Sequence, residues 1–302
     1  MIGSKLKRPG PKFKKMTTHL KGLIITTMGA LFVVPDSLFV RLIGAEALVI
    51  SFWRGLISGL VILLAVLVLQ GTSPFRAVLQ TGRYGIIYIL AAGVSGMLFV
   101  LAVSMTSIAN VVFIIATLPV FAAIYSRPFL GEPISRRMVF TIAAVAVGLA
   151  IIAYGSGDTE GASIEGDLVA LAVSALFAAG LTAARKVKHV SMVPAVPIGY
   201  LSASICLLPF IDPFAIEADK WLLVPLHGIF IVVSSALLAL GPRYISSAEV
   251  GLLILLESVL APLLAWMVID EYPGNWALLG GLVVIGALGI SSALVLLRKN
   301  PA

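Results

Sequence analysis

Three ionisable residues lie inside long apolar stretches of this sequence and are its first candidates for chemistry. Asp36 and Arg54 fall in two successive stretches near the amino terminus, and Glu257 falls in the middle of a later one. A charged side chain at the centre of a membrane helix costs roughly 2.5–3.5 kcal/mol, so it needs a partner, a water-filled cavity or a route to the interface. Such residues bind charged substrates, carry protons or form fixed ion pairs.

Asp36 and Arg54 are expected to lie at similar depth, because each is roughly 9–12 Å from the same end of its helix at a rise of about 1.5 Å per residue. Similar depth permits an ion pair. The functional hypothesis is that Asp36 faces a cavity, with Arg54 as its counter-charge or as a substrate anchor. In the alternative the pair is static, or Arg54 extends to the membrane surface while Asp36 caps a kink at Pro35.

Glu257 is a candidate for transport chemistry because a carboxylate in the middle of a membrane helix can exchange protons or bind a cationic group. Pro262, five residues later, leaves the carbonyl of Ser258 without its helical donor. The alternative is a protonated Glu257 that is hydrogen-bonded to a neighbouring helix.

Further candidates for substrate contacts are polar or aromatic. Asn110 would line a cavity or cap its helix, and Trp53, Tyr88, Tyr125 and Trp266 would stack on an organic molecule. Aromatic residues near the ends of membrane helices are also frequent interfacial anchors, so both roles stay open.

The elements that hold these residues are predicted to be membrane helices. The chain has 302 residues, of which 60% are hydrophobic and 12% charged, and its mean hydropathy is +1.10. Soluble globular chains average roughly 45–50% apolar and about 25% charged residues, so a soluble enzyme is excluded. The apolar runs are continuous and do not alternate, which indicates α-helices. Cys206 is the single cysteine, so no internal disulfide is possible.

Ten apolar segments approach the length of about 20 residues that a bilayer crossing needs. They are expected near 22–42, 47–69, 84–104, 108–127, 138–155, 167–185, 195–212, 222–241, 247–269 and 275–297. The seventh is the weakest, since it carries Pro197 and Pro209. The breaks carry turn residues, for example Gly71-Thr72-Ser73-Pro74. The predicted fold class is an all-α polytopic membrane protein with ten transmembrane helices.

The distribution of Lys and Arg predicts the orientation, because basic loops stay in the cytoplasm. With the amino terminus inside, 18 of the 21 basic residues fall on the cytoplasmic side. We therefore expect a protein of the cell inner (plasma) membrane with both termini in the cytoplasm. Residues 1–16 would form a basic cytoplasmic tail that touches anionic lipid.

An internal repeat divides the chain into two halves. Residues 107–132 align without a gap onto residues 246–271 with seven identities, and Ala30-Leu31-Phe32 recurs at 175–177. Five helices per half is an odd number, so the second half must cross the membrane in the opposite direction. Inverted repeats of this type build transporters with a binding site near the midplane. The two repeats are expected at 17–155 and 166–298.

The sequence resembles the EamA-type members of the drug/metabolite transporter superfamily. The motifs that carry the resemblance are GALFVVPDSLFVRLIG in the first helix, FWRG at the start of the second, LPVFAAIYSRPFLGEPIS in the fourth and LESVLAPLLAWMVIDEYPG in the ninth. The resemblance implies two inverted five-helix halves around a central cavity. It also implies secondary transport of small metabolites such as amino acids, with export as the expected direction.

The predicted function is therefore a secondary transporter that moves a small polar or amphipathic metabolite by alternating access. The sequence contains no GxxxxGK[ST] motif, so transport is expected to be facilitative or coupled to an ion or a counter-substrate. Because the sequence shows no clear sodium site, protons or exchange are favoured. One alternative is an intramembrane serine protease, because Gly93-Val94-Ser95-Gly96 and His227 could supply a Ser95–His227 dyad. A passive channel is another.

The expected partners are the lipid bilayer and the small-molecule metabolite, and a homodimer is left open. We expect no cofactor, no metal site, no catalytic residue and no nucleic-acid partner.

Overall fold

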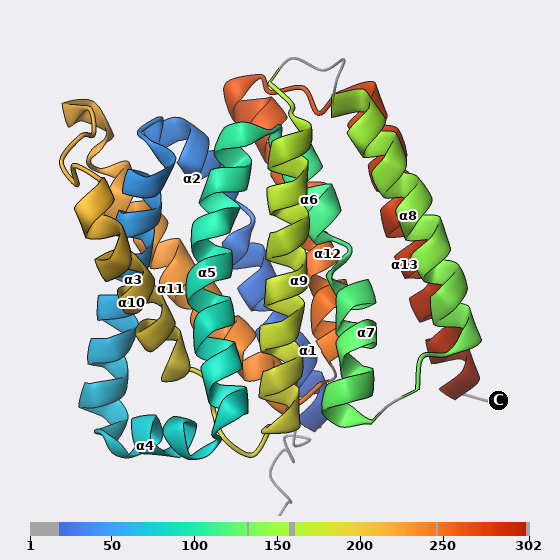
Figure 1. Ribbon diagram of the computed structural model, residues 1–302, viewed down its shortest axis with the longest axis horizontal. Helices are drawn as coiled ribbons and strands as arrows, with labels where there is room; N and C mark the ends of the chain where they lie inside the picture. Colours follow the sequence, from blue (N-terminus) through green and yellow to red (C-terminus); the bar gives the residue numbers. More distant parts are fainter. Residues whose placement is uncertain (1–17, 132, 157–160, 246, 300–302) are drawn as a thin grey trace, which may run out of the picture.

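The chain folds into a bundle of helices, most of which run along one common direction (Figure 1). This computed structural model describes residues 18–131, 133–156, 161–245 and 247–299. The predicted basic tail of residues 1–16 lies outside the described residues, as do Glu132 and Ser246 of the repeat.

The helices of the first half are α1 (Thr18–Val33), α2 (Asp36–Ile43), α3 (Ala47–Gln70), α4 (Ser73–Gln80), α5 (Arg83–Met105), α6 (Ile108–Ile115), α7 (Leu118–Leu130) and α8 (Arg136–Ser156). Those of the second half are α9 (Ile164–Lys186), α10 (Ala195–Leu207), α11 (Leu223–Leu240), α12 (Ser247–Ile269) and α13 (Asn275–Lys299). Short 3₁₀ turns at Leu208–Phe210, Ala218–Lys220 and Gly241–Arg243 flank α10 and α11.

The described chain makes ten crossings of the bundle. Eight helical segments are long and apolar enough to span a membrane, and two shorter apolar segments, Ala195–Phe210 and Asn275–Ser291, supply the seventh and tenth crossings. We call the end of the bundle that carries α2 the α2 end, and the opposite end, which carries α4, the α4 end (Figure 1). Helix α1 starts at the α4 end and α9 starts at the α2 end, so the two halves run in opposite directions. The predicted fold class is confirmed.

Two crossings that were each predicted as one segment consist of two helices. The first consists of α1 and α2, separated at Pro35, and the fourth consists of α6 and α7, separated just before Pro119. A proline has no N–H, so Pro119 cannot donate to the carbonyl of Ile115 four residues earlier. Ser174 of α9 donates its hydroxyl to that carbonyl over 3.3 Å, which satisfies the freed group from a neighbouring helix.

Helix α4 is a further correction. Residues 71–74 were expected to be only a turn, but the eight residues Ser73–Gln80 form a short helix that lies across the α4 end of the bundle (Figure 1). Pro74 stands in its first turn, where the missing N–H costs nothing because that amide has no helical partner. Its eight residues are far fewer than the roughly 20 that a membrane-spanning helix needs.

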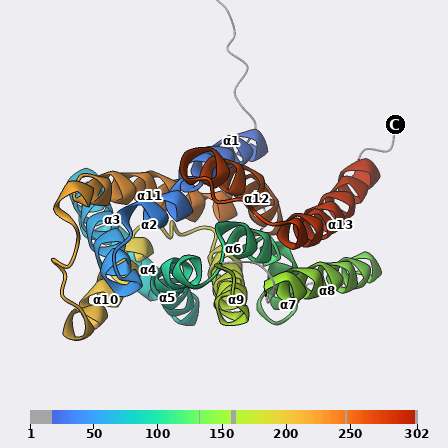
Figure 2. The same cartoon turned by 90° about the horizontal axis from the view of Figure 1, so that it is seen from above.

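The helix pairs follow the repeat (Figure 2). Helix α5 packs on α9 and α1 packs on α11, and the repeat relates these two pairs to each other. Helix α8 packs on α13 and α3 packs on α10, so that each of these four helices contacts its own counterpart. The two self-paired sets lie on opposite sides of the bundle, and α5, α6, α9 and α12 lie between them.

Helices α5 and α10 pack closely at Gly93, where an added Cβ would lie 2.5 Å from the carbonyl oxygen of Gly199. Gly93→Ala is expected to push the helices apart, because overpacking typically costs about 1–3 kcal/mol. The matched change Gly286→Ala meets no atom within 4 Å and should not lower stability, since Ala favours helix over Gly by about 1 kcal/mol. Thermal unfolding in detergent measures both, and equal melting temperatures would contradict the expectation.

Candidate functional site

A cavity lies between the two halves of the bundle. The volume that the centres of water molecules could occupy in this cavity is about 90 Å³. Its walls come from α1, α2, α3, α5 and α6 of the first half and from α9 to α12 of the second. Most of the lining is apolar or aromatic, and the ionisable carboxyl and guanidinium groups in it are those of Asp36, Arg54 and Glu257. The residues singled out first from the sequence therefore line one cavity.

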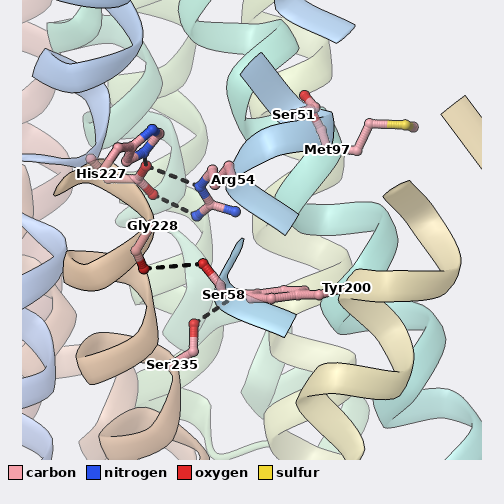
Figure 3. A network of polar contacts seen from close by, with 9 residues as sticks. Ser51, Arg54, Ser58, Met97, Tyr200, His227, Gly228 and Ser235 are labelled. Carbon is pink, nitrogen blue, oxygen red and sulfur yellow. Dashed lines mark hydrogen bonds and ion pairs between the residues drawn. The ribbon is translucent and has the colours of Figure 1, made fainter. Parts of the chain in front are cut away.

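Asp36, Arg54 and His227 form a buried cluster on the wall of this cavity. The Arg54 guanidinium donates two hydrogen bonds to the Asp36 carboxylate, from Nε to Oδ1 over 3.0 Å and from Nη2 to Oδ2 over 2.6 Å. His227 Nε2 lies 2.6 Å from Asp36 Oδ1. Figure 3 shows the Arg54 and His227 side chains converging from α3 and α11. Asp36 opens α2, where its charge also complements the amino-terminal end of the helix dipole.

The remaining faces of Arg54 contact aromatic rings. Its guanidinium carbon lies 5.7 Å from the ring centre of Phe99 and 5.9 Å from that of Tyr200, distances typical of cation–π contacts. A Cβ at Gly96 would lie 3.0 Å from Arg54 Nη1, so the absence of a side chain at Gly96 leaves room for the guanidinium. The Tyr200 hydroxyl in turn lies 2.8 Å from the hydroxyl of Ser235 (Figure 3). The cation is thus held on several sides by the protein itself.

Glu257 projects into the same cavity from α12 in a different environment. It is 5% exposed, and within the described part of the chain its carboxylate has neither a hydrogen bond nor an ion pair. Ser258, the next residue, donates its hydroxyl to the carbonyl of Val112 over 2.8 Å and ties α12 to α6. The hydroxyl of Ser258 thus has a partner on α6, whereas the carboxyl group of Glu257 has no partner among the described residues.

A polar network lies near the α2 end and is centred on Asp167 of α9. The carboxylate accepts hydrogen bonds from the hydroxyl of Thr106 over 2.9 Å, from the side-chain amide of Asn110 over 3.0 Å and from the hydroxyl of Ser156. The Asn110 amide also reaches Ser156 Oγ over 2.8 Å. The network joins α9 to α6, to the end of α5 and to the end of α8. All four members are buried.

A second contact at the α2 end joins the two halves through Glu271, in the segment between α12 and α13. Glu271 Oε2 lies 3.1 Å from Arg41 Nε, and Oε1 accepts the backbone N–H of Ile108 over 2.7 Å. Arg41 also donates from Nη2 to the carbonyl of Thr106 over 3.0 Å. Glu271 thus satisfies a free amide at the start of α6 and carries a charge that suits the helix dipole there.

Apart from Tyr88, the other candidates from the sequence lie outside the cavity lining. Asn110 belongs to the Asp167 network. Trp53 donates from Nε1 to the carbonyl of Pro213 over 2.7 Å and packs edge-on against Trp221. Tyr125 stacks between Phe121 and Phe129 on α7, and Trp266 is 48% exposed on α12. Tyr88 alone among the aromatic candidates lines the cavity.

The protease dyad is not assembled. Ser95 lines the cavity, but the polar contact of His227 is with Asp36 and its ring stacks on Phe39 at 5.3 Å. In the described residues no hydrogen bond joins Ser95 to His227.

Two parts of the site were not predicted from the sequence. His227 was considered only as a protease residue, although its position five residues into α11 places it at the depth of Asp36 and could have indicated the contact. Asp167 carried no such signal, because it stands in the first turn of α9 among other acidic residues and resembles a surface charge.

Comparisons with known proteins agree with this architecture. The model of the EamA-like transporter family matches residues 20–154 and 164–293. The chain is 27% identical over 184 residues to a protein of Bacillus subtilis (strain 168) described as the uncharacterized transporter YdfC, and the match spans 58% of this chain and 59% of that relative. A solved crystal structure that shares 17% identity superposes with a TM-score of 0.67 over 91% of this chain and 98% of its own, which shows the same fold.

Proposed function

Because the chain belongs to the EamA-like transporter family, we propose that it is a secondary transporter that moves a small polar or amphipathic metabolite across a membrane by alternating access. Amino acids and related compounds are the first substrates to test. The observation that carries this proposal is the cavity between the two inverted halves, where Asp36, Arg54 and Glu257 meet an apolar and aromatic lining. Inverted repeats of known transporters place their substrate sites at such an interface.

Alternating access requires that one end of the cavity be closed while the other end opens. The α2 end is filled by packed apolar side chains from α2, α6 and the ends of α3, α5 and α9, including Val40, Val49, Val103 and Ile108. The Asp167 network and the Arg41–Glu271 pair lie at the same end. The cavity itself extends away from them, toward Tyr88 and Leu238. This arrangement supports a state that is closed at the α2 end, and transport would require that these contacts break.

The proposed orientation places the α4 end in the cytoplasm of a cell inner (plasma) membrane. It follows from the basic residues near that end, among them Arg76, Arg83 and Arg185. Helix α1 starts and α13 ends at this end, in keeping with both termini on one side (Figure 1). Export is the proposed direction, and protons or a counter-substrate are the proposed coupling partners, with Glu257 as the group that would exchange a proton or hold a cationic group.

Filling the cavity tests the proposal. Ala92 lines the cavity, and Ala92→Trp is expected to abolish saturable flux of a labelled metabolite panel in proteoliposomes while the protein stays monodisperse. The matched control is Leu279→Trp, since Leu279 is 48% exposed on the outer face of α13. It should leave flux within about twofold of wild type, because a lipid-facing apolar exchange changes little. Undiminished flux through the Ala92→Trp variant would overturn the assignment of this cavity as the transport route.

A further inference from the structure

We propose that the cavity selects an organic cation, a molecule with one ammonium group, an aromatic or alkyl body and no carboxylate, whose ammonium binds Glu257. This inference rests on the proposed function and narrows it, since amino acids themselves become poor ligands.

The Asp36 carboxylate and the Arg54 guanidinium neutralise each other. Both oxygens of Asp36 accept from Arg54, and His227 occupies a further position on Oδ1. Arg54 is in addition covered by the rings of Phe99 and Tyr200. A substrate carboxylate would have to displace Asp36 from a buried two-bond contact and leave that aspartate unpaired, which is strongly unfavourable. Arg54 is therefore not available as an anchor for an anionic group.

The Glu257 carboxylate is in the opposite situation. It is buried in the cavity wall and lacks a cationic partner among the described residues. A buried charge without a partner is costly, and a ligand that brings the missing cation removes that cost on binding. An ammonium group on the substrate supplies both the charge and the hydrogen-bond donors that this carboxylate lacks.

The rest of the lining fits the body of such a molecule. Tyr88, Phe99, Phe177 and Tyr200 supply aromatic faces, which attract cations as well as apolar groups. Ser95 and Ser234 add hydroxyls but no positive charge. Among the described lining residues Arg54 is the one basic side chain, and His227, which contacts Asp36, does not line the cavity. The wall thus offers one carboxyl group without a cationic partner, whereas its basic group is already paired with Asp36.

Three probes that share a phenyl ring test whether the cavity selects an ammonium group and rejects a carboxylate. Phenethylamine carries only the ammonium, phenylalanine carries the ammonium and a carboxylate, and 3-phenylpropionate carries only the carboxylate. Equilibrium binding of each radiolabelled probe to the purified full chain in detergent, and competition with flux in proteoliposomes, are measured side by side. Phenethylamine is expected to bind at least tenfold more tightly than phenylalanine, and 3-phenylpropionate is expected not to compete.

Variants of Glu257 test whether this residue binds the ammonium group. Glu257→Gln is expected to weaken phenethylamine binding at least tenfold, and Glu257→Asp is expected to restore part of it because the charge is kept. The control is Glu165→Gln, which makes the same chemical change at an exposed residue in the first turn of α9 and should bind as wild type does. If Glu257→Gln fails to fold, the ranking of the three probes on wild type still decides the question.

The outcomes distinguish the two proposals. Phenethylamine binding that depends on Glu257, without flux of any compound, supports the cation site and overturns the transport function. Phenylalanine binding as tight as phenethylamine binding, undiminished phenethylamine binding by Glu257→Gln, or no binding of phenethylamine at all overturns the cation selectivity. In those cases saturable flux of another metabolite would leave the transporter proposal standing.

Discussion

Asp36→Asn alone, or Arg54→Gln alone, is expected to lower the free energy of unfolding by about 3–5 kcal/mol and to leave little folded protein in the membrane. Each single change removes one partner of a contact in which Arg54 gives two hydrogen bonds to a carboxylate that is 1% exposed. The partner that remains keeps its charge in a buried site without its counter-charge, although Asp36 would keep its contact with His227. A loss of this size approaches the whole stability of a typical domain.

The double variant Asp36→Asn/Arg54→Gln is expected to recover most of the lost stability, because both charges disappear together and two amides can hydrogen-bond to each other. The measurement is the melting temperature and the yield of monodisperse protein for the two single variants and the double variant. A double variant that is no more stable than the less stable single variant would contradict a direct pair.

Flux through the double variant then shows whether the Asp36–Arg54 pair only stabilises the fold or also acts on the substrate. If Asp36 and Arg54 only hold α2, α3 and α11 together, the double variant transports once it is folded. If Asp36 acts on the substrate, the double variant folds but does not transport. His227→Gln is the matched reference, because it changes the third member of the cluster and leaves the ion pair in place.

Asp167→Ala is expected to open the α2 end of the cavity. The change leaves the hydroxyls of Thr106 and Ser156 and the amide of Asn110 without their shared acceptor, at about 1–3 kcal/mol for each buried donor that finds no other partner. These groups belong to α5, α6 and α8, so α9 loses its polar link to three helices at that end. The population should shift toward a state that is open there.

A cysteine reporter inside the cavity measures this shift. Ser95→Cys is introduced in a Cys206→Ser background, where Cys206 is otherwise the one exposed thiol of the described chain, and an impermeant maleimide is added from each side of sided vesicles. Labelling from the α2 side should rise at least fivefold in Asp167→Ala. The control is Glu165→Ala, an acidic residue of the same helical turn that is exposed. Equal labelling in both variants would show that the Asp167 network does not close this end.

The sequence was sufficient for the order and number of the crossings. Their apolar length, the turn residues between them and the repeat are local properties, and the bilayer requires each spanning segment to satisfy its own backbone hydrogen bonds. The breaks at Pro35 and Pro119 were visible as prolines. The exact course of the chain there was not, because it depends on donors from other helices such as Ser174.

Only the tertiary structure decided which polar residues meet. Lipid and protein interior are both apolar, so a membrane helix is hydrophobic on all sides and its sequence does not mark the face that turns inward. The depth of a residue along its helix could be counted from the sequence. The similar depths of Asp36 and Arg54 indicated that the two residues could pair, and in the structure they do. Rotation about the helix axis could not be counted, and it placed Glu257 in the cavity but Trp266 away from it.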